Sequence, residues 1–307
     1  MKQYDIAVVG EIYVDHILAG FTKWPQPGDE VFTKDYVKEL GGGAAITACA
    51  LGRLGRSVSL VGVVGEDEAS WIEARLVNSG VSFPQLSKSE GRTGVSISIS
   101  NNFDRSFFTF VGENARLEAQ LSSQIIVEHL TCARHVHFAM PLTFRLADSL
   151  LPLLREAGCT TSLDIGYHVS WLRDPENHRT CAAVDYLLPN ELEATVMCGG
   201  NAEDYLNFTT RNGWANGLVK LGAQGAAMRC RDRVVRALPL AVQAVDTTGA
   251  GDAFDAGFID GLLDGASYED CLRRGCICGG LSTRVIGALG SLPGRDELRK
   301  CFEENYG

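Results

Sequence analysis

The stretch DTTGAGDAF, residues 246–254, is the most informative part of the chain. Its small residues Gly249, Ala250 and Gly251 let the backbone approach a ligand closely, and an apolar helical pattern follows at residues 253–263. Amides at a helix N-terminus are unpaired and carry a partial positive charge, which favours a bound phosphate. The stretch therefore predicts an anion hole for a phosphoryl group.

Asp252 lies in the first turn of this predicted helix, where the helix dipole favours an ionised carboxylate. Such a carboxylate can orient an alcohol and accept its proton while the oxygen bonds to phosphorus. The alternative is that Thr248 or Asp252 only caps the helix and that the glycines form a tight turn. These residues alone leave both interpretations open.

Strand and helix patterns alternate along most of the chain. This alternation predicts an α/β fold with a mostly parallel sheet and helices on both faces. We expect strands at residues 6–9, 59–64, 135–138, 161–164, 186–188, 217–220 and 226–229. We expect helices at residues 44–54, 69–78, 147–157, 253–263 and 268–283.

Two β-rich segments, residues 11–40 and 90–111, do not fit the alternation. They could pair with each other as a small sheet beside the main domain. The predicted organisation is therefore a main domain of residues 1–10, 41–89 and 112–307, with residues 11–40 and 90–111 inserted as a separate β unit.

The bulk composition excludes several classes of protein. A formal net charge of −10 argues against a nucleic-acid partner, which requires clustered Lys and Arg. No apolar run reaches the ~18 residues of a membrane helix, and the N-terminus does not fit a signal peptide. The ten cysteines are dispersed without a CxxC pair, which favours reduced thiols. We expect a cytoplasmic protein without a nucleic-acid or membrane partner.

The string DTTGAGDAF resembles the C-terminal signature of the ribokinase-like carbohydrate kinases, the PfkB family. The resemblance spans nearly the whole chain, from VVGEIYVD at residues 8–15 to the final helices. It implies a doubly wound α/β domain, with a small β-sheet lid that covers the sugar. It also implies ATP-dependent phosphorylation of a hydroxyl of a sugar or sugar derivative. Asp252 would be the catalytic base, and the amides of Gly249, Ala250 and Gly251 would form the anion hole.

The same resemblance implies an acceptor site built from both ends of the chain. Asp15 matches the aspartate near the lid that holds sugar hydroxyls. Gly41 and Gly42 match a diglycine that lets the lid hinge and the backbone approach the sugar. Asp164 matches the aspartate of an FDPNxR stretch found in fructokinase and ketodeoxygluconate kinase relatives.

On the nucleotide side, the resemblance implies an ATP site with Mg²⁺. Asn190 and Glu193, in a PNxxE segment, would organise magnesium-bound water near the phosphates. The strand-to-turn element with Lys220, Gly222 and Gly225 would line the site together with Thr248. Some relatives bind a monovalent cation, K⁺ in our assignment, in the region that corresponds to Asp246, Thr248, Ala288 and Gly290.

The substrate pocket departs from the family pattern. Ile46 stands where ribokinases and fructokinases usually carry an asparagine, and Gly43 where ribokinases carry a lysine. A nucleoside kinase or sugar-acid kinase of the same fold therefore stays open, and so does a ligand-binding relative without turnover. Relatives often pair through the lid, which predicts a homodimer.

Two competing motifs are weaker. Gly41-x-Gly43 does not fit a dinucleotide-binding fingerprint, because Ile46 replaces the third glycine and residues 36–40 are a poor strand. His135 and His137 share one face of a predicted strand and could form a metal pair. We favour buried histidines with hydrogen-bond partners.

Overall fold

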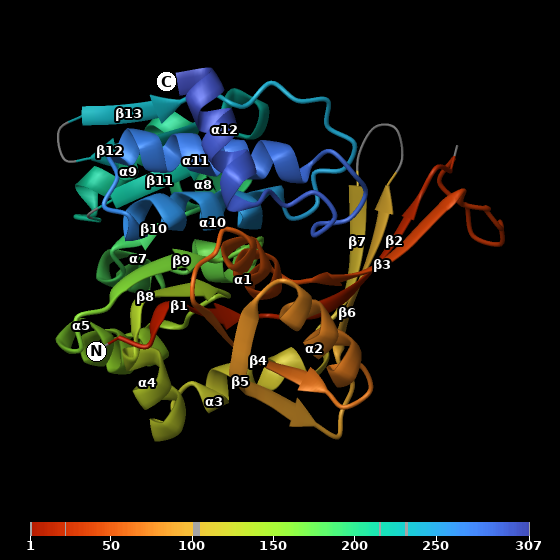
Figure 1. Ribbon diagram of the computed structural model, residues 1–307, viewed down its shortest axis with the longest axis horizontal. Coiled ribbons are helices and arrows are strands. Elements are labelled where there is room, and N and C mark those ends of the chain that lie inside the picture. The colour runs from red at the N-terminus through yellow and green to blue at the C-terminus, as the bar shows by residue number, and fades with distance from the viewer. Residues whose placement is uncertain (1, 22, 101–104, 215, 231–232, 307) are drawn as a thin grey trace.

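The computed structural model describes residues 2–21, 23–100, 105–214, 216–230 and 233–306, and its main feature is a nine-stranded sheet (Figure 1). The strands of this sheet are β1 (Tyr4–Gly10), β4 (Val58–Gly65), β5 (Val81–Ser89), β8 (Ala133–Ala139), β9 (Thr160–Asp164), β10 (Tyr186–Leu187), β11 (Asn216–Lys220), β12 (Ala226–Cys230) and β13 (Arg233–Ala237).

The nine strands lie in the order β13-β12-β11-β10-β9-β8-β1-β4-β5. All neighbours from β11 to β5 pair in parallel, and β12 and β13 are antiparallel. A parallel sheet needs both faces covered, since its crossover connections place helices on them. The predicted α/β class is confirmed.

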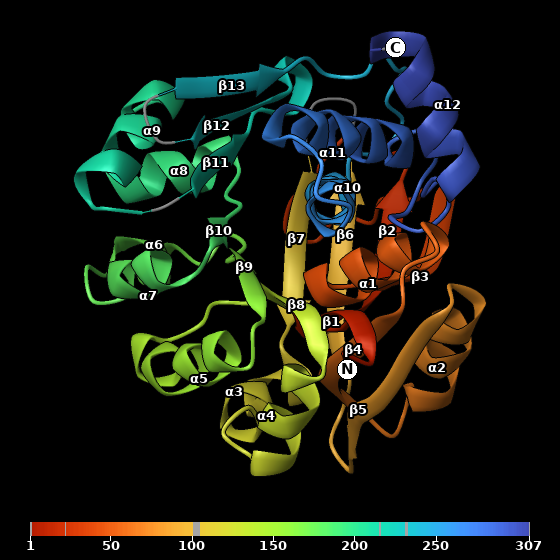
Figure 2. The same cartoon turned by 60° about the vertical axis from the view of Figure 1, so that its left-hand side comes forward.

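Helices cover both faces of the sheet (Figure 2). They are α1 (Gly43–Arg53), α2 (Ala69–Asn78), α3 (Leu117–Gln120), α4 (Gln124–Thr131), α5 (Phe144–Glu156), α6 (Val169–Arg173), α7 (His178–Ala183), α8 (Glu191–Cys198), α9 (Ala202–Arg211), α10 (Ala250–Leu263), α11 (Tyr268–Ser282) and α12 (Arg295–Tyr306). Two short 3₁₀ helices are η1 (Gly112–Arg116) and η2 (Gly222–Gln224).

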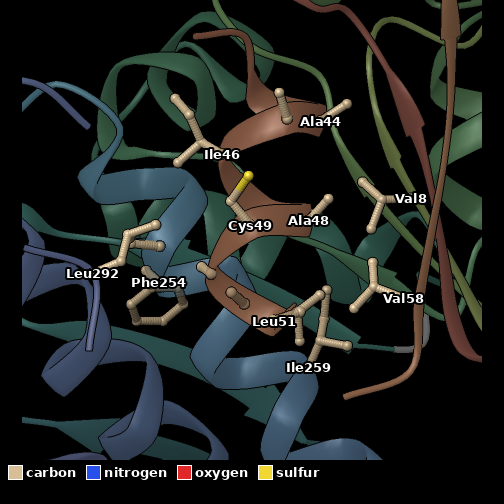
Figure 3. Packing of buried hydrophobic residues seen from close by; sticks show 14 of the residues in the cluster. Val8, Ala44, Ile46, Ala48, Cys49, Leu51, Val58, Phe254, Ile259 and Leu292 are labelled. Atoms are coloured by element: carbon tan, nitrogen blue, oxygen red, sulfur yellow. The ribbon is translucent and has the colours of Figure 1, made fainter. Parts of the chain in front are cut away.

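Strand β1 shows how the sheet separates two cores. Ile6 and Val8 pack with residues of α1, α2, α10 and α11, whereas Ala7 and Val9 pack with residues of α4, α5, α8 and α9. This alternation is the two-residue period of a strand that is buried on both faces. In Figure 3, α1 lies against α10, the helix that begins within the stretch DTTGAGDAF at residues 246–254.

A separate four-stranded sheet stands beside the main domain (Figure 1). We call it the lid; its strands, in spatial order, are β3 (Asp35–Gly41), β2 (Tyr13–Ala19), β6 (Gly94–Ser100) and β7 (Arg105–Phe110). The parallel pairing of β2 with β6 joins the two inserted segments, as predicted. Residues 36–40, which we judged a poor strand, lie within β3, so that part of the sequence interpretation is wrong. The exact limits of the two domains stay a prediction.

Within the described part of the chain, no helix is both long and apolar enough to cross a membrane.

Candidate active site

The N-terminus of α10 follows a turn, residues 246–249, that is held by hydrogen bonds to Asp246. Gly249 is the N-cap residue with φ of 73°, and a Cβ there would lie 2.6 Å from Cβ of Ala288. The carboxylate of Asp246 accepts hydrogen bonds from the Thr248 amide (2.9 Å) and hydroxyl (2.7 Å), and from the amide of Gly287 (2.9 Å). A residue with a side chain would be strained and crowded at position 249, so glycine is required for this turn.

Asp252 lies in the first turn of α10, as predicted. A Cβ on Gly43 would come within 2.9 Å of its Oδ1, so the carboxylate faces the start of α1. Burial, followed by the charge of Asp164, raises the pKa of Asp252 to about 7, although Lys220 acts in the opposite direction. The sequence had suggested that the dipole would keep this carboxylate ionised. Burial is the larger effect, because the charged form loses its hydration.

Asp15 lies on β2 of the lid with 7% of its surface exposed. A Cβ on Gly41 would overlap its carboxyl group at 2.1–2.2 Å, so only glycine fits there. Burial, then the charge of Asp252, raises the pKa of Asp15 to about 7. The glycine segment that begins at Gly41 therefore contacts Asp15 at one end and Asp252, through Gly43, at the other.

The second glycine of the pair has a different role. Gly42 has φ of 88°, and a Cβ would lie 2.3 Å from the carbonyl oxygen of Glu11. The chain therefore passes directly against the connection between β1 and β2 as it enters α1, for which Gly42 is the N-cap residue.

A buried cluster of charges lies beside Asp252. The Lys220 ammonium donates to Asp164 Oδ2 at 2.7 Å and to both carboxyl oxygens of Asp255 at 3.1 Å. One carboxylate oxygen each from Asp164, Asp252 and Asp255 lies within 4.8 Å of the others. Asp164 and Lys220 are the last residues of β9 and β11, so the cluster occupies the carboxyl edge of the parallel sheet, where α/β proteins bind ligands.

The ionisation of this cluster is uneven. Burial acts to raise the pKa of Asp164, but Lys220, a hydrogen bond from Asp255 and the Gly166 amide outweigh it and hold this pKa at about 2. Burial raises the pKa of Asp255 far above its ordinary value, and the charge of Asp164 adds to the shift. The same buried surroundings therefore lower the pKa of one partner of Lys220 and raise the pKa of the other.

Asn190 and Glu193 begin α8 as a capping box. The Asn190 side chain accepts from the Glu193 amide at 3.0 Å, and Glu193 Oε2 accepts from the Asn190 amide at 2.8 Å. Glu193 is only 3% exposed. Burial, then the charge of Asp164, raises its pKa to about 7. The capping box lies beside the charged cluster, because Asn190 forms an isolated parallel bridge with Lys220.

The turn after β11 contains Gly222 and Gly225, with φ of 54° and 87°. A Cβ on Gly225 would lie 2.1 Å from the Ala237 carbonyl oxygen, so the turn packs tightly under β13. The turn is thus fixed directly after Lys220, at the same edge of the sheet.

His135 and His137 have hydrogen-bonding partners, as we favoured. Ser162 Oγ lies 2.8 Å from His135 Nε2 and 2.7 Å from His137 Nδ1, and Thr160 Oγ1 lies 2.8 Å from His135 Nδ1. Burial lowers the pKa of both rings, to about 3 for His135 and about 4 for His137, so both are neutral. Of the four ring nitrogens of these two histidines, His137 Nε2 is the one that lacks a partner among the described residues.

Sequence reasoning missed Asp255, although a signal was present. It follows Asp252 by three residues, so the two side chains share one face of α10. A carboxylate at that spacing in a mostly apolar helix indicates a buried ionic partner. The sequence could not identify that partner as Lys220, which is 35 residues away.

A helix N-terminus beside a buried carboxylate is an arrangement that suits phosphoryl transfer. Comparisons with known proteins agree with this class of reaction. The sequence matches the family described as pfkB family carbohydrate kinase over residues 3–295. The chain belongs to this family, and the predicted kinase class is confirmed.

Individual relatives cover most of the chain. The 2-dehydro-3-deoxygluconokinase of Bacillus subtilis is 27% identical over 289 residues, which is 86% of each chain. An ATP-dependent ribose-1-phosphate kinase of Halopiger xanaduensis is 30% identical over 92% of this chain and 93% of its own. The structure of Arabidopsis thaliana ribokinase complexed with ribose and ATP matches with a TM-score of 0.85 and 26% identity, covering 98% of this chain and 99% of its own.

Proposed function

We propose that the protein transfers the γ-phosphoryl group of ATP to a hydroxyl of a sugar or sugar derivative, with Asp252 as the base. The observation that carries the proposal is the position of Asp252. It lies in the first turn of α10, directly after the amides of Gly249, Ala250 and Gly251, and faces the glycine segment that leads to Asp15. This arrangement supports a base between an anion hole and an acceptor site.

In the reaction, the acceptor oxygen attacks the γ-phosphorus while its proton passes to Asp252. The bond from the γ-phosphorus to the bridging oxygen breaks, and ADP leaves with that electron pair. The three amides at the start of α10 would stabilise the charge on the phosphoryl oxygens. A base with a pKa of about 7 suits proton transfer at neutral pH, since it is ionised in about half of the molecules.

On the acceptor side, we assign Asp15, Gly41 and Gly42. Asp15 is the polar side chain that the lid presents beside the glycine segment, and its two oxygens can accept hydrogen bonds from sugar hydroxyls. The role of Asp164 at the acceptor stays a prediction. Both of its oxygens already accept a hydrogen bond, one from Gly166 and one from Lys220.

On the nucleotide side, we assign Gly222, Gly225 and Thr248 to backbone and side-chain contacts with ATP. The solved relative that contains both ribose and ATP supports an ATP site in this fold. Lys220 directs its hydrogen bonds to carboxylates, so its part in this site is electrostatic.

Two cations belong to the proposal. Mg²⁺ favours oxygen donors and retains water, and the buried carboxylate of Glu193 with the amide group of Asn190 fits the binding of such water. Mg²⁺ would neutralise part of the charge of the ATP phosphates. For K⁺, the loop held by Asp246 would supply main-chain carbonyls; dependence of the rate on K⁺ over Na⁺ tests this assignment.

We further propose that the protein is a homodimer through the lid. The lid face that carries Asp15 also carries Ile17 and Val37, which lie near Gly287 of the main domain. The opposite face exposes Tyr36, Phe108 and Phe110, each more than half exposed. A small sheet with an exposed aromatic face is stabilised when a second copy covers it.

A cytoplasmic location, where thiols stay reduced, completes the proposal. All ten cysteines are free, and most are buried, which supports such a location.

The test of the activity is an ADP-release assay with ATP and Mg²⁺ over a panel of ribose, fructose, 2-dehydro-3-deoxygluconate, sugar phosphates and nucleosides. Asp252→Asn runs in parallel. We expect release that depends on one acceptor class and falls by ~10²–10⁴ in the variant. Activity confined to nucleosides or sugar acids would favour those alternatives. Equal activity of variant and wild type would refute the assignment of Asp252, and silence across the panel would favour a binding protein.

A further inference from the structure

Lys220 is a lysine whose charged end is buried. The residue is 8% exposed, and its ammonium is bound by carboxylates from β9 and from α10. Burial acts to lower the pKa of Lys220, but the charges of Asp164 and Asp255 outweigh it and raise this pKa above its ordinary value. The ammonium is therefore a permanent positive charge in a region from which water is largely excluded.

The position of this charge is fixed relative to the anion hole. A Cβ on Gly251 would lie only 3.4 Å from Lys220 Nζ, so the ammonium lies directly against the backbone of the turn. It also bonds both carboxylates that share the cluster with Asp252. Three elements must meet for this arrangement, since β9 contributes Asp164, β11 contributes Lys220, and α10 contributes both Asp252 and Asp255.

We propose that Lys220 is a positioning residue for phosphoryl transfer: its ammonium, held by Asp164 and Asp255, fixes a positive charge against the anion-hole turn and beside Asp252. The inference rests on the proposed function. The charge acts in two ways. It stabilises negative charge on the transferring phosphoryl group, and it keeps Asp252 able to ionise.

The second effect follows from the groups around Asp252. Asp164 from β9, Asp15 from β2, Glu193 from α8 and Asp255 on the same helix are all acidic. Lys220 from β11 is the cation of this set. Without it, ionised Asp164 would be an uncompensated negative charge, and ionisation of Asp252 beside it would become harder.

The alternative is that Lys220 only braces the sheet against α10. Two variants separate these roles. Lys220→Met keeps the length of the side chain and removes its charge. Lys220→Met/Asp164→Asn also removes the carboxylate that the lysine neutralises, so the cluster regains its charge balance and stays foldable if the single variant does not.

The kinetic readout is the pH dependence of kcat. For Lys220→Met we expect the acidic limb to move up by about one to two pH units. We also expect the plateau of kcat to fall roughly tenfold, with little change in the acceptor KM. This fall is smaller than the ~10²–10³ loss of kcat that is typical when a direct oxyanion donor is removed. In the double variant the acidic limb should return close to that of the wild type, while the plateau stays low. If Lys220 had only a structural role, the acidic limb of the pH profile would stay at the wild-type pH in both variants. That result would overturn the inference.

A second readout does not depend on activity. The ¹³C chemical shift of the Asp252 carboxyl carbon, followed by NMR over pH 4–10, gives its titration midpoint directly. We expect a higher midpoint in Lys220→Met and a midpoint near that of the wild type in the double variant. Unchanged midpoints would refute the inference. If the wild type phosphorylates nothing, the proposed function fails, and this titration still shows whether Lys220 controls the ionisation of Asp252.

Discussion

At the scale of single residues, the candidate site contains buried carboxyl groups whose pKa values are raised, so that burial favours their neutral form. Burial raises the pKa values of Asp15, Glu193 and Asp252 to about 7. Each folded-state pKa lies above the unfolded value. The stability from the neutral form is therefore complete below about pH 4 and is lost as the pH rises to about 7.

Asp252→Asn should therefore stabilise the protein while it removes activity. Asparagine cannot ionise, so above pH 7 the variant avoids the cost of a buried negative charge. We expect its free energy of unfolding to exceed that of the wild type by about 2 kcal/mol at pH 8, with a much smaller difference at pH 4.5. Urea unfolding at both pH values measures it. The exposed Asp148→Asn is the control, and a gain that does not depend on pH would contradict the prediction.

Gly41→Ala tests the contact between the diglycine and Asp15. The new methyl group would overlap the Asp15 carboxyl at 2.1–2.2 Å, so that side chain must move. We expect a rise in the acceptor KM of about tenfold or more, with the KM for ATP nearly unchanged. Gly294→Ala is a matched control, because its methyl group would meet only the Arg53 carbonyl oxygen at 3.8 Å. Equal effects of the two variants on the acceptor KM would argue against an acceptor site at Asp15.

At the scale of elements, two helices begin with the same kind of cap, but only one of these caps lies at the candidate site. α8 and α9 both begin with a capping box, Asn190 with Glu193 and Asn201 with Asp204. Only the first lies beside the charged cluster, because Glu193 is buried near Asp164 and Lys220. The Asn201 box lies at the surface and serves its helix alone.

Asn190→Ala and Asn201→Ala form a matched pair for this difference. Each variant loses a side-chain cap, and we expect each to lower the free energy of unfolding by about 1 kcal/mol. Asn190→Ala should also raise the Mg²⁺ concentration needed for half-maximal activity severalfold, whereas Asn201→Ala should not. Titration of activity with Mg²⁺ at saturating ATP measures this. The same Mg²⁺ dependence in both variants would reduce the Asn190 box to a structural cap.

At the scale of the whole molecule, the chain places its site where two sheets meet. Asp15 comes from the lid and Asp252 from the main domain, and the glycine segment at residues 41–43 passes between them. Aromatic side chains of β7 are exposed on the outward face of the lid. The lid dimer proposed above would cover them.

Phe108→Glu/Phe110→Glu tests the lid dimer. The negative charges of two copies would repel each other across the interface, and the glutamates would stay hydrated. The variant should therefore be a monomer where the wild type is a dimer. Light scattering coupled to size exclusion at micromolar concentration measures the mass. Leu238→Glu, at an exposed leucine of the main domain, is the control. A monomeric wild type would exclude the proposed dimer.

Local sequence patterns were enough to predict most of the main elements and the order in which they alternate. Apolar β-branched runs and the helical pattern after Asp252 are local signals, so β4, β8 and α10 lie within a few residues of their expected ranges. Sequence reasoning missed β5 and β13 and helices such as α8 and α9. Their patterns are short or mixed, and packing against the sheet decides their state.

The tertiary structure alone decided the chemistry of the site. The sequence could mark Asp15, Asp164, Lys220 and Asp252 as candidates, since each stands in a recognisable local motif. It could not join Lys220 to Asp164 and Asp255, which lie 56 and 35 residues away along the chain. Nor could it give Asp252 a pKa of about 7, because burial and the charge of Asp164 act only after the sheet and α10 have packed together.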